Sequence, residues 1–309
     1  MSTIRLGNAL IDRVAEQSLP VSLGLLTDDG EFLSRRIAQL PDGFLDEESM
    51  TFQFSSHSWV VRVDGLTVLV DPCTGNGREG RGPYFDGLNV PFLERLAQSG
   101  VSVDAVDVVF CTHLHHDHCG WNTVQVDGAW VPTFPNATYL LVDEEYRRWD
   151  TSSSDVHPNE FNPNTFDECV RPIVDAGLAK VVSAPYAISS GLTIEPAPGH
   201  TVGHALMRLE SEGMFAYFSG DAFHHPVQLT RPELHLPGCD DLATAIVTRQ
   251  DLVRRALDEG AFLFPAHFPA PHYGHLSIDG GEVCFVPGGA PDADHEQAVC
   301  RRSGVNATD

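Results

Sequence analysis

The chain has 309 residues, with an apolar fraction of 42% and a charged fraction of 20%, which is the composition of a folded globular protein. It carries 19 Lys and Arg against 43 Asp and Glu, a formal net charge of −24, so no nucleic-acid partner is expected. There is no signal-peptide pattern and no run of 18 apolar residues, so no membrane association is expected. The seven cysteines show no CxxC spacing, which favours reduced thiols and a cytoplasmic protein.

The sequence predicts one α/β domain with an addition at each end. Residues 1–50 are predicted to be an N-terminal extension of helix and loop, which could support a homodimer. Residues 51–288 are predicted to form the main domain. Residues 289–309 are rich in Gly, Pro, Asp and Ala and are predicted to be a flexible C-terminal tail.

Strands and helices alternate along the main domain, which indicates a layered fold. In chain order the predicted elements are a hairpin over 55–71 that turns at Asp64-Gly65, a helix over 83–101, strands over 106–111 and 136–142, a helix over 143–150, a polar loop over 151–168, four strand-like runs between 181 and 221, a helix over 244–260 that ends at Gly260, and a strand over 261–267.

The most informative motif lies where the 106–111 strand ends. His113, His115, Asp117 and His118 fall within six residues. Imidazole nitrogens and carboxylate oxygens are suitable ligands for zinc, manganese or iron. Four such groups in so short a loop predict a metal site.

Three more candidate ligands follow apolar runs further along the chain. They are His200 in Pro-Gly-His-Thr, Asp221 in Ser-Gly-Asp and His267 in Pro-Ala-His. Each one alone could simply cap a loop at the end of a strand. The repetition of the pattern after the His-rich loop favours a shared site.

These residues, in this order, resemble the signature of the metallo-β-lactamase superfamily, from about residue 55 to about residue 275. The resemblance implies an αββα sandwich in a single domain, with two divalent ions at one edge of the sheets. Zinc is the first expectation, and manganese, iron or cobalt are alternatives. The implied ligands are His113, His115 and His200 for one ion, Asp117, His118 and His267 for the other, and Asp221 as a bridge, with Asp71 orienting a ligand imidazole.

Within that superfamily, the segments DPCTGNG, THLHHDHCGWNT and PAHFPAP look like the lactonase group. The implied function is the opening of a lactone ring, that of an N-acyl homoserine lactone or a related compound, by a hydroxide that bridges the metals. The first alternative is hydrolysis of an aryl ester or an organophosphate triester at the same site. The second, from another class, is a non-catalytic metal-binding regulatory protein. The expected partner is therefore a small molecule.

Two residues are expected to act in catalysis, Asp117 and His224. Quorum-quenching lactonases of this superfamily carry a Tyr three residues after the bridging Asp, and this chain has His224 there. An imidazole can donate a proton to a leaving alkoxide, and the neighbouring His225 is an alternative for this role. His116 is expected to point away from the metals, and His204 is expected to make structural hydrogen bonds.

Seven aromatic residues could form the wall of an apolar pocket, although ordinary core packing is the alternative for each. They are Phe44, Phe52, Phe54, Tyr146, Trp149, Phe161 and Phe166.

Overall fold

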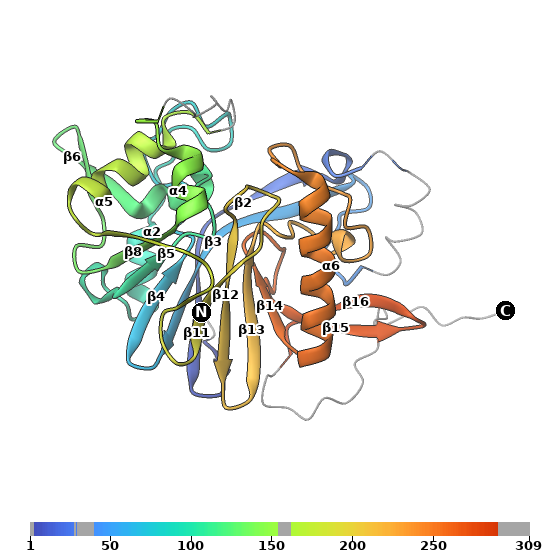
Figure 1. Cartoon of the computed structure of the whole chain (residues 1–309). Coiled ribbons are helices and arrows are strands. Elements are labelled where there is room, and N and C mark those ends of the chain that lie inside the picture. The colour runs from blue at the N-terminus through green and yellow to red at the C-terminus, as the bar shows by residue number, and fades with distance from the viewer. Residues whose placement is uncertain (1–2, 28, 30–39, 154–161, 290–309) are drawn as a thin grey trace.

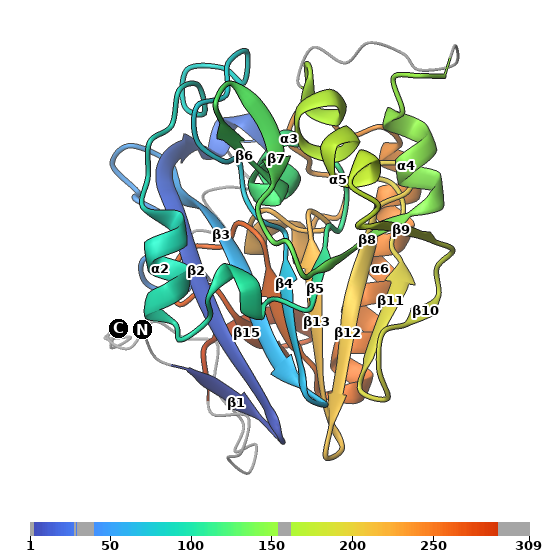
Figure 2. The ribbon, with the colours of Figure 1, turned by 90° about the vertical axis from the view of Figure 1, so that its left-hand side faces the viewer.

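Two seven-stranded β-sheets face each other, and helices cover the outer side of each sheet (Figure 1). This architecture comes from a computed structural model, which describes residues 3–27, 29, 40–153 and 162–289. Helices α2, α4 and α5 lie over the first sheet, as Figures 1 and 2 show, and α6 lies over the second. The predicted αββα sandwich is thereby confirmed as the fold of a single domain.

The first sheet contains most of the N-terminal half of the chain. The strands from β1 to β4 pair with their neighbours in antiparallel fashion. The remaining pairs, β4–β5, β5–β8 and β8–β9, are parallel. In spatial order its strands are β1 (Ile4–Leu6), β2 (Ala9–Ser22), β3 (Thr51–Val63), β4 (Leu66–Val70), β5 (Val108–Phe110), β8 (Thr138–Val142) and β9 (Ala179–Val182).

The second sheet follows the chain in simple order, and only its β13–β14 pair is parallel. A separate ribbon consists of β6 (Thr123–Val126) and β7 (Ala129–Pro132). The strands of the second sheet are β10 (Tyr186–Ala187), β11 (Leu192–Pro196), β12 (Ala205–Ser211), β13 (Met214–Gly220), β14 (Phe262–Pro265), β15 (Gly274–Asp279) and β16 (Glu282–Pro287).

Only α6 (Leu242–Glu259) is long among the helices of the described residues. The short helices are α2 (Phe92–Gln98), α3 (His116–Cys119), α4 (Asp143–Trp149) and α5 (Arg171–Asp175). There are also 3₁₀ turns η1 (Leu23–Leu25), η2 (Val103–Ala105), η3 (Gly120–Asn122) and η5 (Pro226–Leu229), and a π-helical turn η4 (Phe166–Val170).

The long helix α6 agrees with its prediction, because local signals set both of its ends. The Asp241 side chain accepts a hydrogen bond from the Thr244 amide at 3.1 Å, and Gly260 ends the helix with a φ of +61°. None of the helices in the described part of the chain is long and apolar enough to cross a membrane.

The expected helix and loop over residues 1–50 is wrong for residues 4–22, which form β1 and β2, whereas the described residues 40–50 are loop. Strand β2 instead pairs along β3, from Leu10 opposite Arg62 to Ser22 opposite Thr51. Buried and more exposed side chains alternate along much of β2, which is the period-two pattern of a strand. Residues 30–39 and 290–309 lie outside the described part of the chain.

The helix predicted over residues 83–101 is also shorter than expected, since α2 begins only at Phe92. Gly87 adopts a φ of +60°, which a right-handed helix cannot include, and Pro91 disfavours helical geometry in the residue before it. Residues 83–91 are therefore loop, and only the apolar residues from Phe92 onward lie on a helix.

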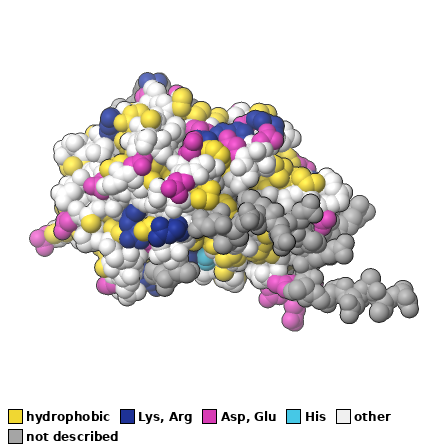
Figure 3. All heavy atoms as spheres, turned by 90° about the horizontal axis from the view of Figure 1, so that it is seen from below, with side chains coloured by type: hydrophobic (Ala, Val, Ile, Leu, Met, Phe, Trp, Pro, Cys, Tyr) yellow, Lys and Arg dark blue, Asp and Glu magenta, His cyan; other side chains and the backbone are white. Residues whose placement is uncertain are grey.

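Charged side chains of both signs occupy the molecular face that is seen from below in Figure 3. Groups of Lys and Arg lie there among Asp and Glu, with small hydrophobic patches between them. The negative net charge is thus not gathered into one continuous acidic surface on this face.

Aromatic rings fill the space between the two sheets. Phe264 on β14 is fully buried, stacks on Phe218 with ring centroids 5.0 Å apart, and meets the edge of Trp59 at 5.0 Å. Phe264 lies three residues before His267. The packing of this core therefore fixes the end of β14 from which His267 extends.

Truncation of this ring tests the core directly. Phe264→Ala should lower the free energy of unfolding by about 3–5 kcal/mol, through lost burial and a residual cavity, as measured by chemical denaturation. The control Val247→Ala, at a side chain 65% exposed on α6, should change it by less than about 0.5 kcal/mol. A loss below about 1 kcal/mol for Phe264→Ala would contradict this account of the core.

Candidate metal centre

The predicted ligands meet at one edge of the two sheets. His113 follows β5, Asp221 follows β13, and His267 follows β14. β4 pairs with β5 in one sheet and β13 pairs with β14 in the other, both in parallel, so each pair ends at one edge of its sheet. The side chains that follow these strands form shared groups, so the two edges adjoin. Residues that are far apart in the sequence are brought together by this topology, as in other sheets with parallel strands.

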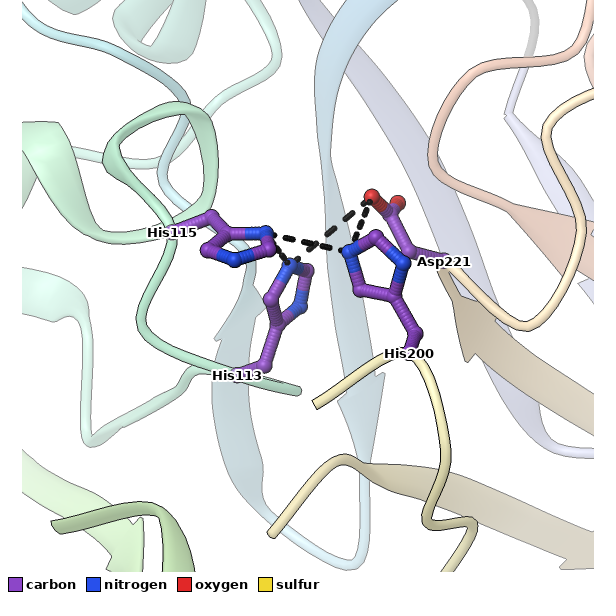
Figure 4. A group of neighbouring side chains, drawn as sticks. All are labelled: His113, His115, His200 and Asp221. Carbon is purple, nitrogen blue, oxygen red and sulfur yellow. Dashed lines mark hydrogen bonds and ion pairs between the residues drawn. The ribbon is translucent and has the colours of Figure 1, made fainter. Parts of the chain in front are cut away.

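Four side chains form a first buried group, which Figure 4 shows. The Nδ1 atom of His115 lies 3.0 Å from the Nε2 atom of His113 and 3.0 Å from the Nε2 atom of His200. The Oδ2 atom of Asp221 lies 3.2 Å from Nε2 of His200 and 3.8 Å from Nε2 of His113. Three imidazoles and one carboxylate therefore converge on a single point.

A second group consists of Asp117, His118 and His267. The Nε2 atoms of His118 and His267 are 3.1 Å apart. The Asp117 carboxylate lies 3.8 Å from His118 and 3.7 Å from His267. The sequence prediction had divided the ligands into the same two groups.

Asp221 lies between the groups. While its Oδ2 atom faces the first group, its Oδ1 atom lies 3.2 Å from Nε2 of His118 and 3.0 Å from Nε2 of His267. No hydrogen bond is made to this buried Oδ1 atom by the described residues. The two carboxylate oxygens thus point into different groups, which is the arrangement that a bridging ligand needs.

The donor sets fit divalent cations. Within each group the candidate ligand atoms lie within 4.8 Å of one another. In a tetrahedral zinc site with bonds of about 2.0–2.1 Å, neighbouring ligand atoms are separated by about 3.3 Å. The nitrogen and oxygen donors also suit manganese or iron. These residues could therefore hold two ions.

Hydrogen bonds leave the Nε2 atoms free to act as ligands. The Thr112 hydroxyl donates to Asp71 at 2.9 Å, so it can only accept from Nδ1 of His113, which lies 3.1 Å away. Nδ1 of His267 donates to the Ser55 carbonyl at 2.9 Å. The Nε2 lone pairs of both rings therefore face the centre.

Asp71 contacts the far side of an imidazole in the second group directly, and one in the first group through Thr112. Its Oδ2 atom lies 3.1 Å from Nδ1 of His118, and it also accepts the Thr112 hydroxyl that contacts His113. Its Oδ1 atom accepts the Thr112 amide at 2.7 Å. One buried carboxylate thus orients an imidazole in each group, in the position expected from the sequence.

The electrostatics of the centre favour added positive charge. Burial lowers the pKa of His115 to about 3 and the pKa of His200 well below its usual value, so these rings are neutral and can bind a cation. Burial alone would raise the pKa of Asp221, but the surrounding imidazoles, led by His118, hold it well below its usual value. Burial likewise opposes the charged form of His118, and the Asp221, Asp117 and Asp71 carboxylates raise its pKa well above normal.

A buried glutamate that the sequence analysis missed joins the ligand loops. The Oε1 atom of Glu145, on α4, accepts the Leu114 amide at 2.8 Å and the Trp149 indole at 2.6 Å. Its Oε2 atom accepts the Thr201 hydroxyl at 2.6 Å and the Gly203 amide at 3.2 Å. The loop that carries His113 and His115 is thus tied to the loop that carries His200. A single acidic residue at the start of a predicted helix gave no signal of this role.

The other histidines near the centre have distinct positions. His224 lies beside the first group, with its Nε2 atom 3.0 Å from Oδ2 of Asp221. His225 faces away, and its Nε2 atom lies 3.0 Å from the Phe44 carbonyl. His204 makes structural hydrogen bonds, as predicted, because it accepts the Asp221 amide and contacts the Ala197 carbonyl. His116 belongs to neither group and packs against Phe85.

A cavity of about 400 Å³ opens onto both groups. Of the seven aromatic residues proposed for its wall, Phe54 lines it and also stacks on His267. The described remainder pack elsewhere: Phe44 and Phe52 lie in the core beneath His225, Trp149 contacts His115, and Tyr146 packs on Phe166. Phe161 lies outside the described residues. Phe85 was missed, and it lines the cavity together with Leu236 and Pro237.

Two facing sheets with outer helices, and a His and Asp centre at one sheet edge, define the class of metallo-hydrolases. A model of the metallo-beta-lactamase superfamily matches residues 51–267, and the chain belongs to that superfamily. The protein is a hydrolase of the family, whose members use divalent metals, typically zinc.

Two curated relatives show how far the sequence similarity extends. The N-acyl homoserine lactonase of Bacillus thuringiensis is 26% identical over 157 residues, which are 47% of this chain and 54% of the relative. Integrator complex subunit 11 of Gallus gallus is 25% identical over 169 residues, which are 52% of this chain and 26% of that protein. The matches thus span about half of the lactonase and about a quarter of the Integrator subunit.

Solved structures resemble the chain over more of its length. The hydrolase AbOPH of the beta lactamase superfamily superimposes with a TM-score of 0.73 and 25% identity, covering 92% of this chain and 96% of that one. AidC, a dizinc quorum-quenching lactonase in complex with a product, gives 0.71 and 19% identity, covering 93% and 97%. The second likeness shows the fold alone.

Replacement of Asp71 tests how the centre is organised. In Asp71→Asn, an amide donor can take the place of the oxygen that accepts from Thr112 and faces His118, so both imidazoles lose their orientation. Metal affinity should fall about 10- to 100-fold, as measured by elemental analysis after dialysis against graded chelator. The control Asp258→Asn, at a side chain 64% exposed on α6, should retain wild-type affinity. Unchanged affinity in Asp71→Asn would refute this organising role.

Proposed function

We propose that the protein is a dinuclear metal-dependent hydrolase that opens the ring of a lactone, an N-acyl homoserine lactone or a related compound. The observation that carries this proposal is Asp221, whose two oxygens face separate imidazole groups beside a cavity of about 400 Å³. This volume lies within the usual range for small-molecule sites. The distant similarity to N-acyl homoserine lactonases supports the choice of substrate.

The proposed ligands are His113, His115 and His200 for one ion, Asp117, His118 and His267 for the other, and Asp221 shared between them. Zinc is the proposed metal in both positions. Divalent ions held there would acidify water towards neutral pH and polarise a carbonyl oxygen. Members of both groups border the cavity: His115, His200 and Asp221 of the first and Asp117 of the second.

The chain's own residues would handle the protons of the reaction. Asp117 borders the cavity and is proposed to accept a proton from water or to return one to the leaving alcohol. His224 also borders the cavity, and its Nδ1 atom is buried without a hydrogen-bond partner among the described residues. We therefore assign His224 to donation toward the leaving oxygen, in the place where lactonases of this superfamily have a Tyr.

His224 is also the observation that favours a second candidate, the hydrolysis of an aryl ester or a phosphotriester. An imidazole donates from a flat ring beside Asp221, whereas a phenol would extend further from the backbone. Such a change at the leaving group could shift the preferred substrate from a cyclic ester to an open one. A test of the function therefore has to include both kinds of substrate.

The function is tested with zinc-loaded protein on a panel of short- and long-chain homoserine lactones, simple lactones, an aryl ester and a phosphotriester. The expected kcat/KM for the best lactone is at least about tenfold above that for the other classes, which corresponds to about 1.4 kcal/mol of transition-state stabilisation. Treatment with EDTA should abolish turnover, and added zinc should restore it.

Two variants complete the assay. His224→Ala should slow lactone turnover while both ions are retained, whereas the exposed control Val247→Ala should match wild type. Turnover of the aryl ester or phosphotriester with inert lactones would replace the proposed substrate by the second candidate. An unchanged rate in His224→Ala would leave that histidine without a role in proton donation.

A further inference from the structure

A β-bulge in the N-terminal strand β2 places an acidic side chain in the interior of the protein. The register with β3 shifts between Ala15 and Gln17, which leaves Glu16 as the extra residue of the bulge. Arg95 of α2 donates to the carbonyls of Ala15 and Glu16 at 2.8 and 2.6 Å, so another element stabilises the bulge. Bulges are frequent beside active sites, where they redirect a side chain. Glu16 is 1% exposed, so the question is what its carboxylate holds.

Four hydrogen-bond donors surround the Glu16 carboxylate. Its Oε1 atom accepts the Gly75 amide at 2.9 Å and the Trp121 indole at 2.8 Å. Its Oε2 atom accepts the Ser56 hydroxyl at 3.0 Å and the Thr74 amide at 3.1 Å. Burial of a carboxylate is costly unless donors meet it, as these four do. Three segments of the chain, β3, the loop after β4 and the turn η3, therefore meet at one side chain.

The first of these segments leads to His267. Ser56 follows Ser55, whose carbonyl accepts the Nδ1 proton of His267 at 2.9 Å. The Ser55 amide also donates to the His267 carbonyl at 3.1 Å. The position of β3 at these two serines therefore orients one candidate ligand of the second group.

The second segment leads to His118 through Asp71. The loop after β4 begins at Asp71, whose Oδ2 atom lies 3.1 Å from Nδ1 of His118. Asp71 and Cys73 adopt φ values of +50° and +36°, which are uncommon for residues other than glycine and persist where surrounding contacts hold them. The bonds from Glu16 to the next two amides of the loop are contacts of this kind.

The third segment directly follows α3, which carries two candidate ligands of the second group. Trp121 lies in η3, three residues after His118. The Trp121 amide donates to the Pro72 carbonyl at 2.7 Å, and the Gly120 amide donates to the Cys73 carbonyl at 2.6 Å. The end of α3 is thus fastened to the same loop after β4.

We propose that Glu16 is a positioning residue for the second ligand group, Asp117, His118 and His267. This inference rests on the proposed two-ion centre, and it gives a role to the part of the chain that precedes the family match. Glu145 has the corresponding place in the first group, because it joins the loops that carry those ligands. Each group is then organised by a buried glutamate of its own.

The contacts of Glu16 favour the second group over the first. All three segments that meet at Glu16 lead directly to ligands of the second group. The route to the first group is longer, since it runs through Asp71 and then through the Thr112 hydroxyl to His113. Loss of Glu16 should therefore weaken the ion of the second group more than the ion of the first.

The test compares zinc binding by Glu16→Gln and Glu145→Gln. An amide nitrogen cannot accept a hydrogen bond, so it would oppose the donors on one side of either carboxylate. During dialysis against graded chelator, Glu16→Gln should lose one of two zinc ions at a chelator concentration at least about tenfold below that of wild type, and the other within about threefold. Anomalous scattering from crystals of the one-ion form should place the remaining zinc in the first group. In Glu145→Gln it should lie in the second.

Two further variants separate positioning from loss of fold, which thermal unfolding monitors. Leu209→Ala, at a fully buried residue toward the end of β12 remote from His204, should lower the unfolding temperature and release both ions as wild type does. Trp121→Phe removes one donor to Glu16 and keeps a ring stacked on Phe92. It should weaken the second-group ion by about threefold or more.

Unchanged release of both ions by folded Glu16→Gln, or equal weakening of both, would refute the role of Glu16 and leave the two-ion centre intact. If Glu16→Gln does not fold, Trp121→Phe decides the question by the same criteria. Wild-type protein that binds fewer than two zinc ions would contradict the two-ion centre itself.

Discussion

The carboxylate of Asp221 is the constraint on which the arrangement of the centre depends. Its two oxygens face different imidazole groups, so its position sets the distance between them. The backbone holds it there: His204 accepts the Asp221 amide at 3.1 Å, and Gly220 before it adopts a φ of +48°. A Cβ atom on Gly220 would lie 2.5 Å from the Thr112 hydroxyl, so the close contact of these two loops requires glycine.

Two other buried carboxylates, Asp71 and Glu145, hold the residues that surround the candidate ligands. Asp71 orients one imidazole in each group, and Glu145 ties the loop before α3 to the loop after β11. Burial raises the pKa of Glu145, while its hydrogen bonds from Thr201, Leu114 and Trp149 oppose that shift. Burial of a carboxylate is costly unless donors surround it, as they do here. The candidate ligands are therefore held in position by these supporting residues as well as by the strands that carry them.

Local signals in the sequence indicated the candidate ligands, because each lies in a segment that follows a strand, and the family resemblance implied their division into two groups. His200, Asp221 and His267 each carried a local signal in the form of an apolar run followed by a turn. Glu145 carried no such signal, since its role arises from contacts with residues distant in the chain. The strand β2 was missed for a related reason: its alternation was visible, but its partner β3 begins almost thirty residues later. Local patterns thus indicated the candidate ligands, and only tertiary structure shows which residues position them.

The central claim is that Asp221 joins two metal ions, and counting and locating those ions tests it most directly. The account predicts two zinc ions per chain by elemental analysis of zinc-loaded protein. It also predicts two anomalous-scattering peaks in a crystal, one on each imidazole group, with an Asp221 oxygen bound to each. A single peak, or two peaks of which Asp221 contacts only one, would contradict it.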